Sequence, residues 1–180
     1  EEELPKFKTD LLGNYQIKNY KTAYATLGVL EQKGWDISNK NIENGFLNVV
    51  KNTGLQGRWQ LLNKSPKVIC DTAHNKEGLS LVLNQLKKEE FDQLHIVLGV
   101  VADKNLDAIL PLFPKNAIYY FCKPAVIRGL AEAMLQQKAK AYELIGASYV
   151  SVSEAYKSAM TAAKAKDLIF IGGSTFVVAE

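Results

Sequence analysis

The sequence predicts an α/β fold in which a mainly parallel β-sheet lies between two layers of helices and is preceded by a small helical segment. Two observations predict it. From about residue 67 onward, short apolar runs rich in β-branched and aromatic residues alternate with segments of helical periodicity. The links between them are short, so successive strands are expected to be parallel and joined by right-handed helical crossovers. The expected architecture is a Rossmann-like three-layer α/β/α sandwich.

The segment that precedes the sheet has helical periodicity and no strong strand pattern. One helix is expected over residues 20–33, because apolar residues recur on one face and Gly34 is a typical stop. Ser38 is suited to cap a second helix. The apolar face of that second helix contains Ile42, Phe46, Val49 and Val50. Two helices bury too little surface to be stable alone, so they are expected to pack on the remainder of the chain or on a part missing from it.

The elements expected after residue 57 alternate along the chain. The strands are RWQLL (58–62), KVICD (67–71), HIVLGVV (95–101), AIYYFC (117–122), SYVSV (148–152) and DLIFIGG (167–173), with TFVVAE (175–180) as a further candidate. The helices cover residues 75–88, 104–113, 129–140 and 153–165, each with apolar residues at helical spacing.

Composition narrows the possible functions. The net charge is only +3 and the lysines are scattered, so a nucleic-acid or membrane surface is not expected. No apolar stretch approaches the roughly 18 residues of a membrane-spanning helix. Cys70 and Cys122 each end an apolar run, which predicts small buried thiols in a reducing, cytoplasmic compartment. The opening residues lack an initiator methionine and any element pattern, so we expect the chain to be a fragment.

Polar residues gather where the expected fold would bind a ligand, beyond the carboxyl ends of parallel strands. Asp71 directly follows a buried strand, and its carboxylate could accept hydrogen bonds from a ribose diol, bind a cation or cap the next helix. His74 stands at the entrance of that helix, where an imidazole could meet an anion beside unpaired backbone N–H groups or serve only in capping and packing. The other histidine, His95, opens a strand and is expected to be structural.

Further polar groups follow the same pattern with weaker signals. Only two arginines occur, Arg58 and Arg128, and a guanidinium after Gly57 could form a fork onto phosphate. The pair at 103–104, in GVVADKN, is either a site element or an N-cap and a solvated lysine, and GGS at 172–174 ends a strand where a ligand could approach. The chain has no Walker motif, no clustered metal ligands and no Ser/His/Asp order. These residues alone predict an anion-facing edge without naming the ligand.

Six segments carry a resemblance to a known family. They are GNYQIKNYKTAYATL, GRWQLL, VICDTAHNKEGL, GVVADKN, IRGL and IGGSTFVV. In order and approximate spacing they resemble the end of the central ATPase domain and the carboxy-terminal domain of folylpolyglutamate synthase/dihydrofolate synthase, in the Mur ligase superfamily. The Asp-x-Ala-His-Asn element after Gly-Arg-x-Gln is the strongest match. The resemblance covers nearly all of the chain and assigns residues 1–52 to the helical end of the central ATP-binding domain and residues 53–180 to the carboxy-terminal domain.

The resemblance implies ATP-dependent amide ligation, in which the γ-phosphate passes to a carboxylate and the amine of glutamate attacks the acyl phosphate. By analogy, Asn19 would contact adenine, Arg58 the phosphates and Asp71 the ribose. His74 would be a catalytic and substrate-binding residue near the transferred phosphate or the incoming glutamate. Ser174 would bind substrate beside it.

The resemblance also implies cofactors and partners. ATP and Mg²⁺ would be used, with the P-loop, the Mg²⁺ ligands and a modified lysine all upstream of this chain and no metal held here. The partners would be L-glutamate and folate or dihydropteroate, with no nucleic acid or membrane, and the enzyme would be a monomer. Lacking the P-loop, the chain alone is expected to be inactive. Two departures from the family pattern are Thr72 in place of Gly and Lys76 in place of Pro, and the second leaves the helix start less fixed.

Two alternatives remain from the sequence. The chain could belong to a sister ligase of the superfamily with another acid substrate, or be a non-catalytic α/β module that binds a nucleotide or a partner. In a ligase, the two domains are expected to close around ATP, with residues 51–57 as a linker in which two glycines absorb the rotation.

Overall fold

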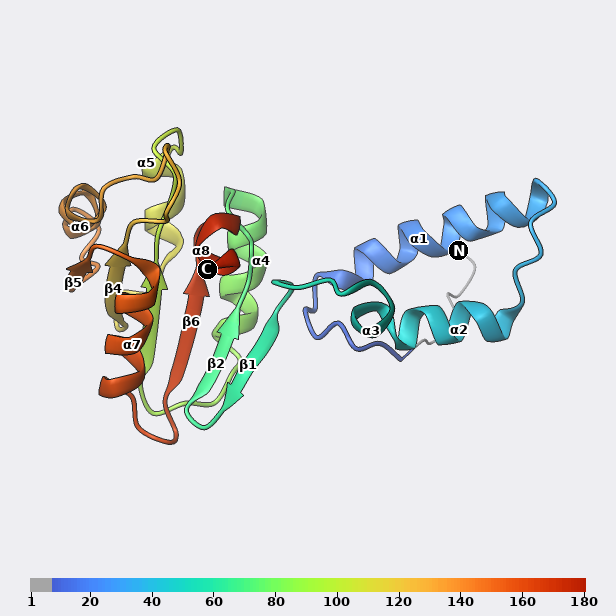
Figure 1. Ribbon diagram of the computed structural model, residues 1–180, viewed down its shortest axis with the longest axis horizontal. Coiled ribbons are helices and arrows are strands. Elements are labelled where there is room, and N and C mark those ends of the chain that lie inside the picture. The colour runs from blue at the N-terminus through green and yellow to red at the C-terminus, as the bar shows by residue number, and fades with distance from the viewer. Residues whose placement is uncertain (1–7) are drawn as a thin grey trace. The chain divides into compact units, whose positions relative to one another are not determined.

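A computed structural model of the protein describes residues 8–180. It divides into two compact units, Glu1–Arg58 and Trp59–Glu180, and each is described by itself (Figure 1). The assignment of residues 1–52 and 53–180 to different domains of a ligase stays a prediction. The opening residues 1–19 were expected to form no element. Residues 1–7 lie outside the described part of the chain, and residues 16–19 already belong to the first helix, so the expectation is wrong there.

The described residues of the first unit form helices and no strand, as expected. The helices are α1 (Gln16–Gln32), α2 (Asn39–Leu47) and α3 (Val49–Thr53). Ser38 caps α2, because its Oγ accepts a hydrogen bond of 3.2 Å from the backbone N–H of Asn41. The second helix was expected to continue through Val50, but the helix is interrupted at Asn48 and a new helix, α3, begins at Val49. The break has a physical cause: the carboxylate of Asp10 accepts the N–H of Val50 at 2.9 Å and so provides a new helix start.

The second unit is built on a six-stranded sheet with the order β1-β2-β6-β3-β4-β5. The first pair of strands is antiparallel and all other neighbours are parallel. The expected α/β fold with a mainly parallel sheet is therefore confirmed. The strands are β1 (Gln60–Lys64), β2 (Lys67–Cys70), β3 (Leu94–Leu98), β4 (Ile118–Cys122), β5 (Gly146–Tyr149) and β6 (Leu168–Gly172).

Helices cover both faces of this sheet, with α7 on one face and α4 on the other (Figure 1). The expected apolar stripe of α4, from Leu79 to Leu86, is buried. The missing proline at Lys76 is compensated by Asn75, whose side chain accepts the N–H of Gly78 at 2.8 Å and fixes the helix start. The helices are α4 (Lys76–Leu86), α5 (Leu106–Ile109), the 3₁₀ helix η1 (Leu110–Leu112), α6 (Glu132–Lys140), α7 (Val152–Ala162) and α8 (Thr175–Ala179).

The segment TFVVAE, considered as a strand, forms the helix α8 instead. The strand β6 cannot continue into it, because Gly173 has a φ of +92° and reverses the chain. Ser174 then caps α8, accepting the N–H of Phe176 at 3.2 Å. The helix expected over 104–113 is also shorter than expected, since Pro111 lies in the 3₁₀ helix η1 that ends it.

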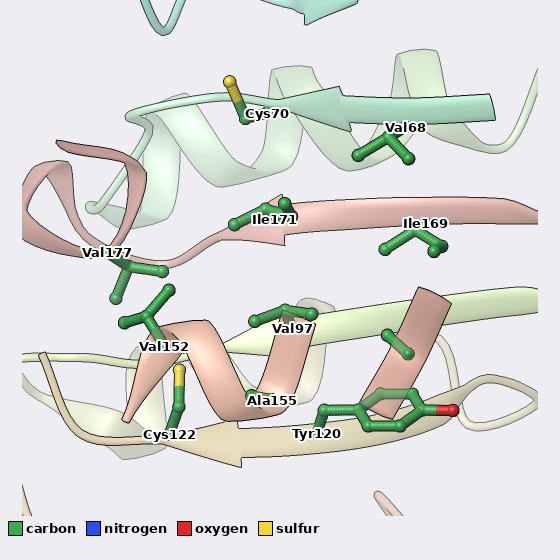
Figure 2. Close-up of a cluster of buried hydrophobic side chains, with 11 residues drawn as sticks. Val68, Cys70, Val97, Tyr120, Cys122, Val152, Ala155, Ile169, Ile171 and Val177 are labelled. Carbon is green, nitrogen blue, oxygen red and sulfur yellow. The ribbon is translucent and has the colours of Figure 1, made fainter. Parts of the chain in front are cut away.

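One apolar cluster connects the sheet to α7 and α8. Figure 2 shows side chains of β2, β3, β4 and β6 facing Val152 and Ala155 of α7 and Val177 of α8. Cys70 and Cys122 belong to this cluster and are buried, as expected. Burial raises the pKa of the Cys70 thiol to about 11 and that of Cys122 to about 12, so both stay protonated and unreactive.

The register of the parallel strands brings their carboxyl ends to one edge. Cys70 pairs with Ile171, Leu98 with Gly172, and Leu98 also with Phe121. The loops that follow β2, β6, β3 and β4 therefore start side by side. Among the described residues, no helix is long and apolar enough to cross a membrane.

Candidate functional site

A cavity of about 300 Å³ lies at the carboxyl edge of the parallel strands. Four loops that are distant in the sequence contribute to it, those after β2, β3, β4 and β6. Two of the expected site residues, His74 and Ser174, share this cavity. The complete lining is His74, Val101, Asp103, Lys104, Arg128, Ser174, Thr175 and Phe176.

His74 lies exposed in the turn before α4, and its own backbone fixes its ring. The Nδ1 atom is 3.0 Å from the carbonyl oxygen of Thr72. A carbonyl only accepts, so Nδ1 must carry the proton and donate it. The neutral imidazole therefore keeps its lone pair on Nε2, the nitrogen that is able to accept a proton or a hydrogen bond from a ligand.

Ser174 is positioned by the turn between β6 and α8. Its side chain is buried, and its Oγ accepts the N–H of Phe176. A hydroxyl that accepts one hydrogen bond can still donate its own proton. The turn needs glycine at position 173: a Cβ there would lie 2.6 Å from Cδ1 of Leu98 and 2.7 Å from the carbonyl oxygen of Gly99.

Arg128 and Lys104 make the lining cationic, with Asp103 as the one carboxylate among the lining residues. The guanidinium of Arg128 lies 5.1 Å from the centre of the Phe176 ring, and its Nη1 is 3.4 Å from Oδ2 of Asp103. The backbone also holds the two loops together, since the carbonyl of Arg128 accepts the N–H of Ala102 at 2.8 Å. Asp103 is therefore not the helix cap considered from the sequence; Asn105 caps α5.

Sequence reasoning considered Lys104 as part of a possible site element and noted Arg128 as one of two arginines, but assigned neither residue a role. The signal was present, because Arg128 is one of only two arginines in the chain and follows a strand end. What the sequence lacked was the strand order that brings the loops after β3, β4 and β6 to one cavity.

Asp71 lies at the same edge but does not line the cavity. Its side chain is only 2 % exposed. One carboxylate oxygen accepts the N–H of Trp59 at 2.7 Å and the other that of Ala73 at 2.8 Å. The capping role considered for Asp71 is wrong, because Asn75 caps α4. A ribose contact stays a prediction.

Asn19 and Arg58 belong to the first unit. Asn19 is exposed in the first turn of α1, where its amide donates to the side-chain oxygen of the buried Gln16 at 2.7 Å. The Nη1 of Arg58 is 3.4 Å from the carbonyl oxygen of Gly57. Their roles toward adenine and phosphates also stay predictions.

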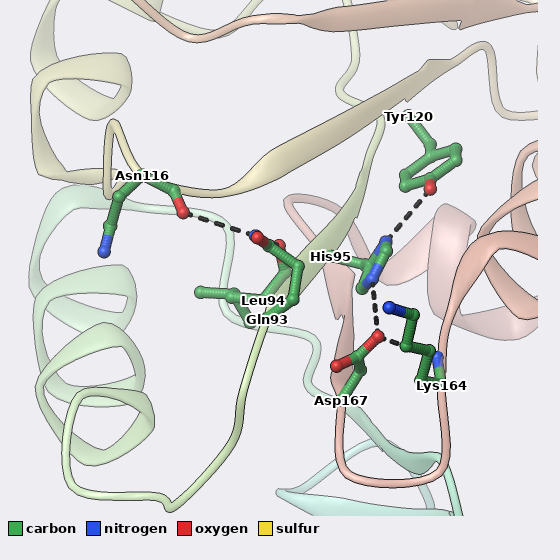
Figure 3. Close-up of polar contacts among 7 residues, drawn as sticks. All are labelled: Gln93, Leu94, His95, Asn116, Tyr120, Lys164 and Asp167. Carbon is green, nitrogen blue, oxygen red and sulfur yellow. Dashed lines mark hydrogen bonds and ion pairs between the residues drawn. The ribbon is translucent and has the colours of Figure 1, made fainter.

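A second polar cluster lies at the opposite, amino-terminal edge of the sheet (Figure 3). His95 of β3 is buried, with Nδ1 3.0 Å from the hydroxyl of Tyr120 and Nε2 3.4 Å from Oδ2 of Asp167. The N–H of Lys164 donates to the same oxygen at 2.7 Å. That bond and the contact with His95 hold the pKa of the Asp167 carboxyl below its usual range, although burial opposes the shift. The cluster joins β3, β4 and the start of β6, a structural role for His95.

Metal ligands are not gathered in the described part of the chain. Among residues 8–180, no group of three or more His, Cys, Asp or Glu side chains could hold a metal ion. No Mg²⁺ ligand is therefore assigned to the described residues, and the proposed steps depend on no metal held by this chain.

Comparison with known proteins adds a family to this geometry. A family model described as "Mur ligase, glutamate ligase domain" matches residues 57–175. The dihydrofolate synthase/folylpolyglutamate synthase of Escherichia coli is 29% identical over 161 residues, which are 88% of this chain and 36% of that protein. A probable bifunctional folylpolyglutamate synthase/dihydropteroate synthase of Haloferax volcanii is 29% identical over 174 residues, 94% of this chain and 20% of the relative.

Solved structures of similar proteins also match this chain. E. coli FolC in complex with DHPP and ADP matches 99% of this chain and 40% of its own with a TM-score of 0.78 and 27% identity. The folylpolyglutamate synthase of Mycobacterium tuberculosis complexed with ADP and AMPPCP shares the fold, with a TM-score of 0.80 at 24% identity over 95% of this chain and 40% of its own. The chain thus spans between a fifth and two fifths of the length of these relatives.

Proposed function

Because the chain belongs to the Mur ligase family and matches its glutamate ligase domain, we propose that it acts in the ATP-dependent addition of L-glutamate to a folate or dihydropteroate carboxylate. The observation that carries the proposal is the cationic cavity at the carboxyl edge, where Arg128 and Lys104 lie beside His74 and Ser174. A cavity of about 300 Å³ suits a small ligand, and two cations complement the two carboxylates of glutamate.

The proposed role of this cavity is to hold the incoming amino acid. Arg128 has a planar fork that matches a carboxylate, and the ring of Phe176 and the carboxylate of Asp103 orient it before a ligand arrives. Lys104 provides a second, more mobile positive charge. Ser174, held by its bond to Phe176, can donate its hydroxyl proton to an anionic oxygen.

The proposed role of His74 is that of a general base. ATP supplies the phosphoryl group that activates the acceptor carboxylate. The amine nitrogen of glutamate then forms a bond to the activated carbonyl carbon, the bond from that carbon to the phosphate oxygen breaks, and phosphate leaves with the electron pair. The amine must lose a proton for this attack, and Nε2 of His74 holds the lone pair that can take it.

The nucleotide is proposed to be recognised by Asn19, Arg58 and Asp71, at adenine, phosphates and ribose respectively. E. coli FolC, 27% identical to this chain, has been solved with ADP, and the match covers 99% of the chain. The carboxylate of Asp71 already accepts two backbone N–H groups. A ribose hydroxyl is proposed to donate a hydrogen bond to the same carboxylate when the nucleotide is bound.

The phosphoryl-transfer groups are proposed to come from residues outside these 180. No GxxxxGK[ST] motif occurs in the sequence, and Mg²⁺ would be held with ATP by those other residues. We expect a cytoplasmic protein, because both thiols are buried and reduced. A monomeric enzyme is also part of the proposal, as the resemblance of the sequence implies.

The proposal is tested by incubating the full-length protein with ATP, Mg²⁺, L-glutamate and either dihydropteroate or a folate, and by following the products by mass spectrometry. We expect ATP-dependent gain of a glutamyl residue on one or both acceptors. Gain on neither acceptor, with turnover on another carboxylic acid, would show a sister ligase instead.

A further inference from the structure

The first residue of the second unit, Trp59, has an unusual backbone. Its φ is +51°, in the left-handed region that is a genuine outlier for a bulky residue. Such a conformation is strained and persists only where the surroundings hold it. The side chain is 4% exposed, so the indole is anchored in the interior.

The carboxylate of Asp71 is what holds this backbone. Oδ2 accepts the N–H of Trp59 at 2.7 Å, a short charge-assisted bond. Asp71 is itself fixed, because its own N–H donates to the carbonyl of Ile171 at 3.1 Å and its other oxygen accepts the N–H of Ala73. The acceptor is therefore a buried charge tied to β6 and to the turn before α4.

The bond continues the pairing of β1 with β2. Gln60 pairs with Cys70, so the next antiparallel position places Trp59 opposite Asp71. At this position a side-chain oxygen of Asp71, and not a backbone carbonyl, accepts the N–H of Trp59. The left-handed turn lets the chain leave the sheet while its last N–H group remains paired.

The glycines before Trp59 differ from it in how easily their backbone angles can change. Gly54 and Gly57 also have positive φ, +67° and +68°, but glycine accepts these values without strain and can leave them easily. Trp59 has a large side chain and a charged partner, so it cannot rotate without breaking a buried hydrogen bond. The part of the linker able to rotate thus ends at Arg58.

We propose that Asp71 is a positioning residue: its carboxylate locks Trp59 and thereby sets the direction in which Arg58 leaves the second unit. Rotation of the linker is confined to the segment from Gly54 to Arg58. This restraint of the Trp59 backbone by Asp71, called the lock below, is argued from geometry alone. Only its consequence for nucleotide binding rests on the proposed function, through the phosphate role given to Arg58.

The lock is tested in the full-length protein by amide hydrogen exchange. The Trp59 N–H should exchange slowly in the unmodified protein, and Asp71→Asn should speed its exchange by about tenfold or more, because the uncharged amide has a single acceptor oxygen for the N–H groups of Trp59 and Ala73. Amides within the β2–β6 pairing should keep their protection. The matched control is Asp92→Asn, which alters an exposed carboxylate of the same unit and should change neither. Fast exchange at Trp59 in the unmodified protein overturns the lock even if the variant fails to fold.

The consequence for Arg58 is tested by a double-mutant cycle on Mg-ADP affinity of the full-length protein. If Asp71 also acts through Arg58, then Asp71→Asn should weaken ADP binding several-fold more in the parent than in an Arg58→Ala background, where only the proposed ribose contact of Asp71 remains to be lost. Two losses that simply multiply would show that Asp71 affects the nucleotide through its own contact alone and would overturn the coupling to Arg58. If Arg58→Ala alone leaves ADP affinity unchanged, the phosphate role in the proposed function fails, while the exchange experiment still decides the lock.

Discussion

Arg128 and Asp103 meet at the cavity, with Nη1 of the arginine 3.4 Å from Oδ2 of the aspartate. Their side chains are 58% and 62% exposed, so the pair adds little to stability and its charges stay accessible to a ligand. The ring of Phe176 supports the guanidinium from a second direction. A cation so supported is prepared for a carboxylate before the ligand arrives.

We therefore expect Arg128→Ala to raise the KM for glutamate by about 10- to 100-fold, the equivalent of one charged hydrogen bond, with the KM for ATP unchanged. Arg128→Lys should raise the KM for glutamate less than Arg128→Ala does, because lysine keeps the positive charge and loses only the planar fork. Lys138→Ala removes an exposed cation of α6 and serves as the control. Steady-state kinetics of the full-length protein measures all three, and an unchanged KM for glutamate in Arg128→Ala contradicts the assignment.

His74→Gln should lower kcat by about 10²- to 10⁴-fold, the usual contribution of a general base, while ADP affinity is retained. The glutamine side chain can still donate and accept hydrogen bonds but cannot take a proton. Nitrogen NMR of the unmodified protein should show the proton of the neutral ring on Nδ1, as its bond to Thr72 requires. A normal kcat in the variant would exclude His74 as the base.

Asp167→Asn should lower the free energy of unfolding by about 1–3 kcal/mol, because the buried contacts with His95 and the Lys164 N–H are weakened. The folded-state pKa of the Asp167 carboxyl lies below its usual range, because the Lys164 N–H and His95 favour the charged form. Its contribution to stability is therefore fully present above the unfolded-state pKa and is lost as pH falls through the lower folded-state pKa.

Urea denaturation of the parent and of Asp167→Asn across this pH range measures the effect. The difference between the two should be constant near neutral pH and should shrink in acid. The exposed Asp92→Asn variant should stay within about 0.5 kcal/mol of the parent. A difference between parent and Asp167→Asn that grows on acidification contradicts the direction given for the pKa of Asp167.

Gly173→Ala should destabilise the second unit by more than about 1 kcal/mol. The added Cβ would meet Leu98 and the carbonyl oxygen of Gly99, and the φ of +92° is unfavourable for alanine. Displacement of the turn should also weaken glutamate binding through Ser174. In the control Gly28→Ala, on α1, nothing lies within 4 Å of the new Cβ, so thermal unfolding should show no loss.

The isolated 180-residue chain should not add glutamate to any acceptor. It has no GxxxxGK[ST] loop, so it cannot position a γ-phosphate for transfer. Mass spectrometry after incubation with ATP, Mg²⁺, glutamate and acceptor checks this. ATP-dependent glutamylation by the isolated chain would refute the proposal that phosphoryl transfer needs residues outside these 180.

Local patterns account for most of the fold. The apolar stripe of α4 and the buried runs of β2, β3, β4 and β6 are found where periodicity placed them. The errors occurred where a single residue decides. Gly173 turned the expected last strand into α8, and the carboxylate of Asp10, distant in sequence, ended α2 early. Periodicity and residue propensity are read over short segments of sequence, so they do not include contacts of this kind.

By itself the sequence determined most of the elements, the fold class and the resemblance to a ligase, because side-chain periodicity and short motifs are local properties. It also pointed to His74 and Ser174, which share one cavity. Only the tertiary structure decided that Arg128 and Lys104 join them and that Asp71 is turned toward the backbone of Trp59. The reason is that the order β1-β2-β6-β3-β4-β5 determines which loops become neighbours, and long-range strand pairing is not written in any one segment.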